Sequence, residues 1–276
     1  MDFPSDRFEL VRRWKMQLHK ELVLLKYIWP TLLVAVFCQY LHSIFTNLVY
    51  YLYDFYRVYE QKELVDLGFE LFSPALDQDK YGWSSELITF GMIAWAIIFG
   101  GSVFVVNRPT PIYALHILHR ALWVVTICFI GRIVSFTFTL LPSPSSFCYP
   151  TDPEYNPPTT AWEIISRLDL FTGCGDLVFS SHTTYTTVCA LVYIHYGSWK
   201  SIKVFVGTSV VCVGLLIIGL RRHYTVDVWL AWFIVPMVWK LMDVHWKDMY
   251  PAELMELEKE YKEKNEENDL ELQSGA

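Results

Sequence analysis

Long apolar blocks, separated by shorter polar segments, are the main pattern of this chain. Six blocks are apolar over most of their length, and they cover residues 27–53, 87–107, 113–141, 177–196, 204–220 and 224–242. A helix needs about 20 predominantly apolar residues to cross the hydrocarbon core of a bilayer. Only 18% of the residues are charged, against about 25% in a typical soluble domain. The pattern therefore predicts an all-α, polytopic membrane protein with six transmembrane helices.

The polar segments divide the chain into three regions. Residues 1–26 predict a short amphipathic helix on the membrane surface, residues 27–246 form the six-span membrane domain, and residues 247–276 form a charged tail. Most of the net charge of -7 lies in this acid-rich tail. A strongly basic patch is missing from the sequence, so nucleic acid is not an expected partner.

Positive charges beside the apolar blocks predict the orientation in the membrane. Six spans place both termini on one side, together with the turns at Arg108 and at residues 200–203. These segments are basic, so the positive-inside rule assigns them to the cytosol. The two longest loops, one acidic and one Pro-rich, then lie on the luminal or outer side. His182 and His223, at the starts of the fourth and sixth blocks, come out on that same side.

Two polar stretches, residues 174–183 and 221–227, carry the candidate chemistry. His223 and Asp227 are four residues apart, a spacing that puts both side chains on one face of a helix. Asp227 can then accept a hydrogen bond from one ring nitrogen while the other nitrogen attacks phosphorus. His182 is the candidate acid for the leaving alkoxide and, afterwards, the base for an incoming hydroxyl. The pattern indicates phosphoryl transfer through a histidine on a lipid phosphodiester.

Positive charge for the phosphate oxygens is a further requirement of such a reaction. Arg221 and Arg222 adjoin His223, and Arg132 lies inside the third block, where it needs an anion. Backbone N–H groups at the start of the fourth helix can add to the cradle. Further candidate substrate- or phosphate-binding residues are Asp176, Ser180 and Ser181. Each feature alone also fits a structural role, but their convergence on one membrane face favours a catalytic site that needs no metal or other cofactor.

The cysteines leave two interpretations open. Under the expected topology, Cys148 and Cys174 are the cysteines of the luminal loops. An oxidising lumen allows a disulfide between them, and two free thiols fit the sequence equally well. No Cys/His spacing in the sequence indicates a structural zinc site.

The two stretches contain Cys-Gly-Asp-x-x-x-Ser-x-His-Thr and His-Tyr-Thr-x-Asp-Val, which resemble the paired motifs of the sphingolipid synthases. These enzymes are six-span relatives of the lipid phosphate phosphatases, and the likeness is closest to the plant-type inositol phosphorylceramide synthases. It covers most of the membrane region and includes residues 37–42, 74–80, Arg132 and 221–232. Ser181 stands where animal sphingomyelin synthases have Gly.

The resemblance implies a lipid phosphatase-like helical core and a specific reaction. His182, His223 and Asp227 match the family's catalytic triad, with His223 as the nucleophile. The family transfers a phospho-headgroup from a glycerophospholipid to the primary hydroxyl of ceramide and releases diacylglycerol. In the plant-like branch the donor is phosphatidylinositol, so the resemblance implies a phosphatidylinositol:ceramide inositolphosphotransferase with a phosphohistidine intermediate. It also implies a Golgi location, a luminal site and cytosolic termini.

Other functions stay open at this point. No residue in the sequence distinguishes an inositol headgroup from choline or ethanolamine, so a sphingomyelin or ethanolamine phosphorylceramide synthase also fits the motifs. A lipid phosphatase or phospholipase C would use water in place of ceramide, although the Arg that phosphatases carry six residues before the nucleophile is Ile217 here. A catalytically silent lipid-binding or scaffold protein is the alternative from another class. The oligomeric state is left open by the sequence.

Overall fold

The computed structural model describes residues 7–106, 112–168, 173–246 and 259, and every regular element within them is helical. The prediction of an all-α protein is confirmed over this part of the chain. The long helices are α1 (Arg7–Phe55), α2 (Gln78–Gly101), α3 (Ala114–Phe138), α5 (Ser181–Tyr196), α6 (Lys200–Gly219) and α7 (Thr225–Trp246). The short elements are α4 (Ala161–Ser166) and the 3₁₀ turns η1 (Val58–Glu60), η2 (Leu67–Phe72), η3 (Ser102–Phe104) and η4 (Ser146–Cys148).

Five of the long helices, α1, α2, α3, α6 and α7, are long and apolar enough to cross a membrane. They make the chain an integral membrane protein, but the predicted count of six spans is not confirmed. The exception is α5, which has 16 residues and rises only about 24 Å at about 1.5 Å per residue. The fourth apolar block was expected to be helical from Leu177. Instead its first residues form a loop, because Ser180 caps the helix by accepting a hydrogen bond from the N–H of Thr183.

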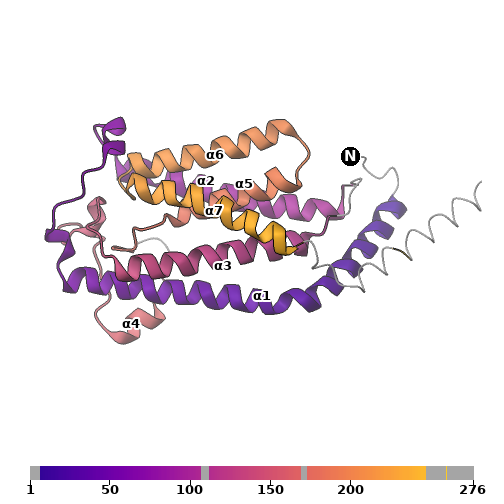
Figure 1. Cartoon of the computed structure of the whole chain (residues 1–276), viewed down its shortest axis with the longest axis horizontal. Helices are drawn as coiled ribbons and strands as arrows, with labels where there is room; N and C mark the ends of the chain where they lie inside the picture. Colours follow the sequence, from indigo (N-terminus) through magenta and orange to yellow (C-terminus); the bar gives the residue numbers. More distant parts are fainter. Residues whose placement is uncertain (1–6, 107–111, 169–172, 247–258, 260–276) are drawn as a thin grey trace, which may run out of the picture.

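Helix α5 lies at the centre of the bundle, where it contacts α2, α3, α6 and α7. Figure 1 shows α1 and α3 side by side along the bundle, with α4 on the outer side of α1. Large apolar side chains remain on the outer faces of the spanning helices, as expected of surfaces that face lipid. Examples with about two thirds or more of their surface exposed are Val36, Ile97, Phe205 and Phe233.

The N-terminal segment is part of a longer helix, because α1 runs without interruption from Arg7 to Phe55. Glu21 fixes this segment to the bundle: its carboxylate accepts hydrogen bonds from the backbone N–H of Ala114 at 2.7 Å and of Leu115 at 2.9 Å. It therefore caps the start of α3 from another helix. The turn at Arg108 and the predicted tail, apart from residue 259, lie outside the described residues.

The loops near the C-terminal end of α1, at Phe55, are joined to one another. A disulfide connects Cys148 with Cys174, so the interpretation as a pair of free thiols is wrong for this structure. The hydroxyl of Tyr224 donates to Pro142 O at 2.8 Å and accepts from Leu64 N at 3.1 Å. The hydroxyl can make both bonds because a phenol is at once a donor and an acceptor. These links position the starts of α5 and α7 beside each other.

Candidate active site

A cavity of about 400 Å³ opens where α5 and α7 begin. The predicted site residues among those that line it are Arg132, Asp176, Ser181, His182, Arg222 and His223. Asp227 is fully buried beside His223, and Ser180 is buried at the cap of α5. The structure therefore brings the three predicted triad residues, His182, His223 and Asp227, together around one cavity.

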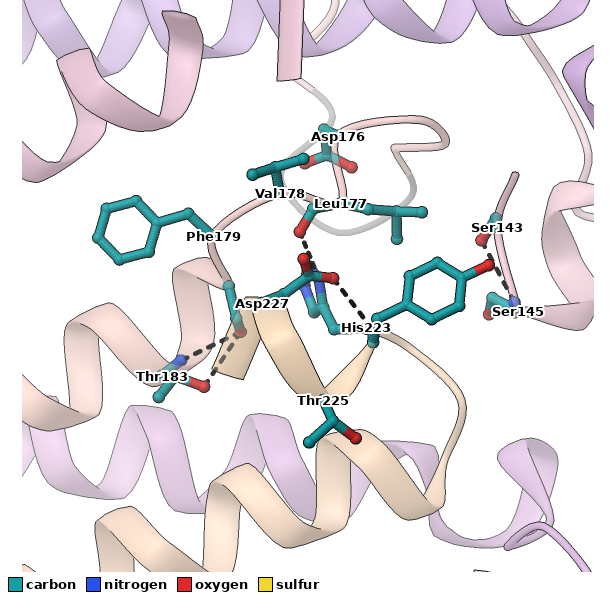
Figure 2. Close-up of polar contacts among 12 residues, drawn as sticks. Ser143, Ser145, Asp176, Leu177, Val178, Phe179, Thr183, His223, Thr225 and Asp227 are labelled. Carbon is teal, nitrogen blue, oxygen red and sulfur yellow. Dashed lines mark hydrogen bonds and ion pairs between the residues drawn. The ribbon is translucent and has the colours of Figure 1, made fainter. Parts of the chain in front are cut away.

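His223 is fixed through one of its two ring nitrogens. Its Nδ1 lies 2.9 Å from the carbonyl oxygen of Leu177 and 3.5 Å from Oδ2 of Asp227. Both neighbours are hydrogen-bond acceptors, so in the neutral ring Nδ1 carries the proton and Nε2 has the lone pair. Figure 2 shows the Leu177 carbonyl and the Asp227 carboxylate beside the ring. The sequence predicted the role of Asp227 but not that of Leu177, because a backbone carbonyl leaves no signal in residue type.

Asp227 has one oxygen in use and one without a partner. Its Oδ2 accepts a hydrogen bond from the backbone N–H of Tyr224 at 3.0 Å, whereas Oδ1 is buried and has no partner among the described residues. The backbone carbonyl of Asp227 accepts from Ser180 N at 3.2 Å, which joins the start of α7 to the start of α5. A buried polar atom that is left unsatisfied is costly and is often found at functional sites.

His182 is the second residue of α5 and lines the cavity. Its Nδ1 is buried and, within the described part of the chain, has no hydrogen-bond partner. Ser180 caps the helix and has no exposed surface. Ser181 begins the helix and lines the cavity next to His182. The start of α5 therefore presents Ser181 and His182 to the cavity, and the N-terminus of a helix favours an anion nearby.

Arg132 binds the loop in front of α5 rather than standing free in the cavity. Its Nη2 donates to the carboxylate of Asp176 at 2.6 Å and to the Asp176 carbonyl at 2.8 Å. Its Nη1 donates to the carbonyl of Phe179. The sequence predicted that Arg132 needs an anion, and Asp176 supplies it. The side chain is only 2% exposed, so in this structure Arg132 holds the loop and adds positive charge to the wall of the cavity.

The loop that Arg132 holds has an unusual backbone at Phe179. Phe179 has a φ of 72°, a left-handed conformation that costs a non-Gly residue about 1–3 kcal/mol. This conformation directs its carbonyl to Arg132 and leaves Leu177 beside His223. Such strain persists where surrounding contacts over-determine the backbone, and it is concentrated at functional sites.

His42 belongs to the site, although sequence reasoning gave it no role of its own. Its Nε2 accepts a hydrogen bond from Nε of Arg132 at 3.0 Å, and its ring lies edge-on to Phe129. It lines the same cavity from α1. The signals were a histidine inside an otherwise apolar block and its place in the family-like segment 37–42, but without the fold nothing connected it to Arg132.

Arg221 and Arg222, which follow α6, point in different directions: Arg222 toward the cavity and Arg221 toward Phe69. Arg222 lines the cavity, and its Nη1 donates to Glu86 of α2 at 2.7 Å. Arg221 has a φ of 55°, and its guanidinium lies 3.9 Å from the ring centre of Phe69 in η2. Arg221 is not among the residues that line the cavity. The structure thus places Arg222, but not Arg221, where a phosphate could be bound.

No group of three or more His, Cys, Asp or Glu side chains in the described ranges is arranged to hold a metal ion. What the cavity offers is a histidine whose Nδ1 faces two acceptors, a second histidine, and two arginines that are each paired with a carboxylate. These are the components of acid–base and nucleophilic chemistry at a phosphate group.

The family described as PAP2 superfamily C-terminal matches residues 173–244, the segment that contains His182, His223 and Asp227. Phosphatidylinositol:ceramide inositolphosphotransferase 2 of Arabidopsis thaliana is 32% identical over 234 residues, covering 83% of this chain and 74% of the relative. Phosphatidylinositol:ceramide inositolphosphotransferase of Oryza sativa subsp. japonica is 33% identical over 239 residues, covering 83% and 71%. A putative phosphatidylcholine:ceramide cholinephosphotransferase 3 of Caenorhabditis elegans is 39% identical over 71 residues, which cover 25% of this chain and 21% of the relative.

Proposed function

Because the chain belongs to the sphingolipid synthase family, with plant phosphatidylinositol:ceramide inositolphosphotransferases similar to it over most of its length, we propose that it transfers inositol phosphate from phosphatidylinositol to the primary hydroxyl of ceramide. Diacylglycerol is the second product. The observation that carries this proposal is His223, which lines the cavity with its Nδ1 held by Leu177 and Asp227 and its Nε2 left as a nucleophile.

In the first half-reaction, Nε2 of His223 attacks the phosphorus of phosphatidylinositol. The P–N bond forms as the bond from phosphorus to the diacylglycerol oxygen breaks. His182, in its protonated form, gives its proton to the departing oxygen. Asp227 stabilises the positive charge that develops on the ring of His223, as a carboxylate next to Nδ1 can do. The intermediate is an inositol phosphate bound to His223.

In the second half-reaction, neutral His182 takes the proton from the primary hydroxyl of ceramide. The ceramide oxygen attacks phosphorus, and the P–N bond breaks to return His223 to its starting form. Arg222 and the N–H groups at the start of α5 are the groups that would bind the phosphate oxygens in both steps. Arg132 acts mainly by holding the Asp176–Phe179 loop, since its donors are used within the protein.

We also propose that the chain crosses the membrane six times, with α5 as the fourth crossing. The loop from Gly173 to Ser180 would complete that crossing, because non-helical backbone is tolerated at membrane depth where it is buried in protein or lines a cavity. Contacts with Arg132, His223 and Asp227 satisfy several of its backbone groups. The site would then face the lumen of the Golgi, both termini would be cytosolic, and both lipids would enter from the bilayer.

A headgroup-transfer assay tests the function. The protein is made cell-free into liposomes with fluorescent ceramide, and phosphatidylinositol, phosphatidylcholine or phosphatidylethanolamine is supplied alone. We expect a phosphorylated ceramide only with phosphatidylinositol, and a fall of about 10³-fold or more in kcat for His223→Ala, because a nucleophile cannot be replaced by its neighbours. His19→Ala, which removes an exposed histidine from α1, is the matched control.

The other outcomes of this assay lead to different enzymes. A product with phosphatidylcholine or phosphatidylethanolamine would keep the mechanism and replace the donor. Released headgroup without a ceramide product would make the protein a hydrolase. Unchanged transfer by His223→Ala would exclude the phosphohistidine route. This intermediate can also be detected directly with phosphatidylinositol labelled at phosphorus. Without ceramide, an acid-labile label should remain on the wild-type protein and be absent from the variant.

A further inference from the structure

A second cavity, of about 530 Å³, lies between α1, α2, α3 and α5 and adjoins the first. The two cavities share four lining residues, Gln39, Ile93, Phe129 and Tyr185. Apart from these shared residues, the second cavity is lined almost entirely by apolar side chains such as Leu32, Ile97, Leu118 and Val192. Its volume is in the usual range for a small-molecule site, about 300–1,000 Å³. It can therefore hold a hydrocarbon chain that continues from the site of reaction.

The four shared residues form a neck between the two cavities, and two of them are polar. The hydroxyl of Tyr185 donates a hydrogen bond to Oε1 of Gln39 at 2.8 Å. The ring of Tyr185 also packs against Phe129, with 5.1 Å between the ring centres. Gln39 and Tyr185 thus meet across the bundle, from α1 and α5, at the point where the polar cavity becomes apolar. A polar pair in this position is the expected binding site for the polar part of a lipid next to its chains.

The neck lies about one helical turn from the residues that carry the chemistry. Tyr185 follows His182 by three residues on α5, and Gln39 precedes His42 by three residues on α1. Residues at this spacing lie on the same face of a helix, and three residues rise about 4.5 Å. The primary hydroxyl and the amide of ceramide are attached to neighbouring carbons, so a hydroxyl next to His182 leaves the amide within about one helical turn, close to the neck.

We propose that Gln39 and Tyr185 bind the amide group of ceramide, with a ceramide chain in the apolar cavity and the primary hydroxyl next to His182. Ceramide is the acceptor in the function proposed above, and this assignment rests on that function. Because Tyr185 donates to Oε1, the pair still offers the N–H groups of Gln39 Nε2 as donors and the Tyr185 oxygen as an acceptor. The amide of ceramide has one acceptor and one donor, which match this set. The glycerol esters of phosphatidylinositol have acceptors only and would leave the Tyr185 oxygen without a donor.

The test compares ceramide with N-methylceramide, which lacks the amide N–H, in liposomes that contain phosphatidylinositol. We expect the wild-type protein to use ceramide with a kcat/KM about three- to tenfold higher, the size of effect that one hydrogen bond supplies. Tyr185→Phe and Gln39→Leu should raise the KM for ceramide and bring this ratio close to one, while the KM for phosphatidylinositol stays unchanged. Tyr40→Phe is the matched control, since its hydroxyl bonds to Ile165 O outside both cavities.

Three results would overturn the assignment: no preference by the wild-type protein, a preference that both neck variants retain, or a rise in the KM for phosphatidylinositol instead of that for ceramide. A second measurement does not depend on activity. Ceramides with a photoreactive group on the N-acyl chain or on the sphingoid chain are compared: one of them should label residues that line the apolar cavity, and Gln39→Leu should reduce that labelling. If no phosphorylated ceramide is made but this labelling occurs, the proposed function fails while the ceramide site stands. Labelling only outside the cavity would remove the site.

Discussion

At the scale of single residues, the candidate site separates the groups that are proposed to react from the groups that hold them. His223 and His182 line the cavity, whereas Asp227 lies behind His223 with no exposed surface. Arg132 donates hydrogen bonds to Asp176 and Phe179, and Arg222 donates one to Glu86. Asp176 and Glu86 hold the two guanidinium groups in position. A negatively charged phosphate group therefore enters a site whose arginines are already ordered. Such preorganisation avoids a cost of ordering side chains at the moment of reaction.

The role of Asp227 can be tested by Asp227→Asn. Asparagine can still accept from Tyr224 N, so the start of α7 should remain folded. Because the oxygen that accepts from Tyr224 N is also the one next to Nδ1 of His223, the amide keeps this geometry but lacks the negative charge that stabilises the cation formed on the ring. We expect kcat for ceramide phosphorylation to fall by about 10²- to 10⁴-fold, with a thermal unfolding temperature close to that of the parent. Asp79→Asn, at an exposed position of α2, is the control. A variant that keeps full kcat would show that Asp227 only supports the helix.

The pairing of His223 with Asp227 could be predicted from sequence because its geometry is local. His223 and Asp227 lie within about one helical turn of each other. Charged or polar residues at the start of an apolar block are also easy to recognise in the sequence. The direction of Arg221 was not predictable, since it follows from a left-handed φ at that residue. The partnerships of His42 with Arg132 and of Glu86 with Arg222 join segments that are far apart in sequence. A single sequence gives no information on such pairs.

At the scale of elements, the length of α5 shows where hydropathy and structure differ. Leu177, Val178 and Phe179 are apolar, so a hydropathy pattern includes them in the fourth block. Their backbone is instead used to hold the site, since Leu177 O contacts His223 and Phe179 O contacts Arg132. The other five blocks were predicted well, because an uninterrupted apolar run in lipid must satisfy its backbone within the helix.

The approach of α6 to α7 depends on Gly214. A Cβ at this position would lie 2.4 Å from Cζ2 of Trp232 and 2.8 Å from Cγ1 of Val228. We expect Gly214→Ala to destabilise the protein by about 1–3 kcal/mol, the usual cost of overpacking, and to lower activity because α7 carries Asp227. Gly207→Ala is the matched control on the same helix, since a Cβ there would meet no atom within 4 Å. Thermal unfolding in detergent measures both, and equal stability of the two variants would contradict the close packing.

At the scale of the whole molecule, the site lies where loops that are distant in sequence are joined. The disulfide between Cys148 and Cys174 links the Pro-rich loop to the segment before α5. Tyr224 connects that loop to the segment before α2 through Pro142 and Leu64. At the other end of the bundle, the buried Arg120 of α3 joins α7 through the carbonyl of Trp239 and the carboxylate of Asp243. Both ends of α3 are therefore fixed to the helices that carry the triad.

The proposed six crossings would place the site and the turn between α5 and α6 on opposite sides of the membrane, and this arrangement can be measured. Glu154 and Ser198 are exposed positions in the Pro-rich loop and in that turn. In sealed vesicles with the cytosolic face outward, Ser198→Cys should react with a membrane-impermeant maleimide at once, and Glu154→Cys only after detergent is added. The parent chain, with its exposed Cys212, gives the background. If α5 does not cross the membrane, both cysteines lie on one side and react together. The basic turn between α5 and α6 would then be on the same side as the site. The positive-inside assignment, which puts them on opposite sides, would be wrong.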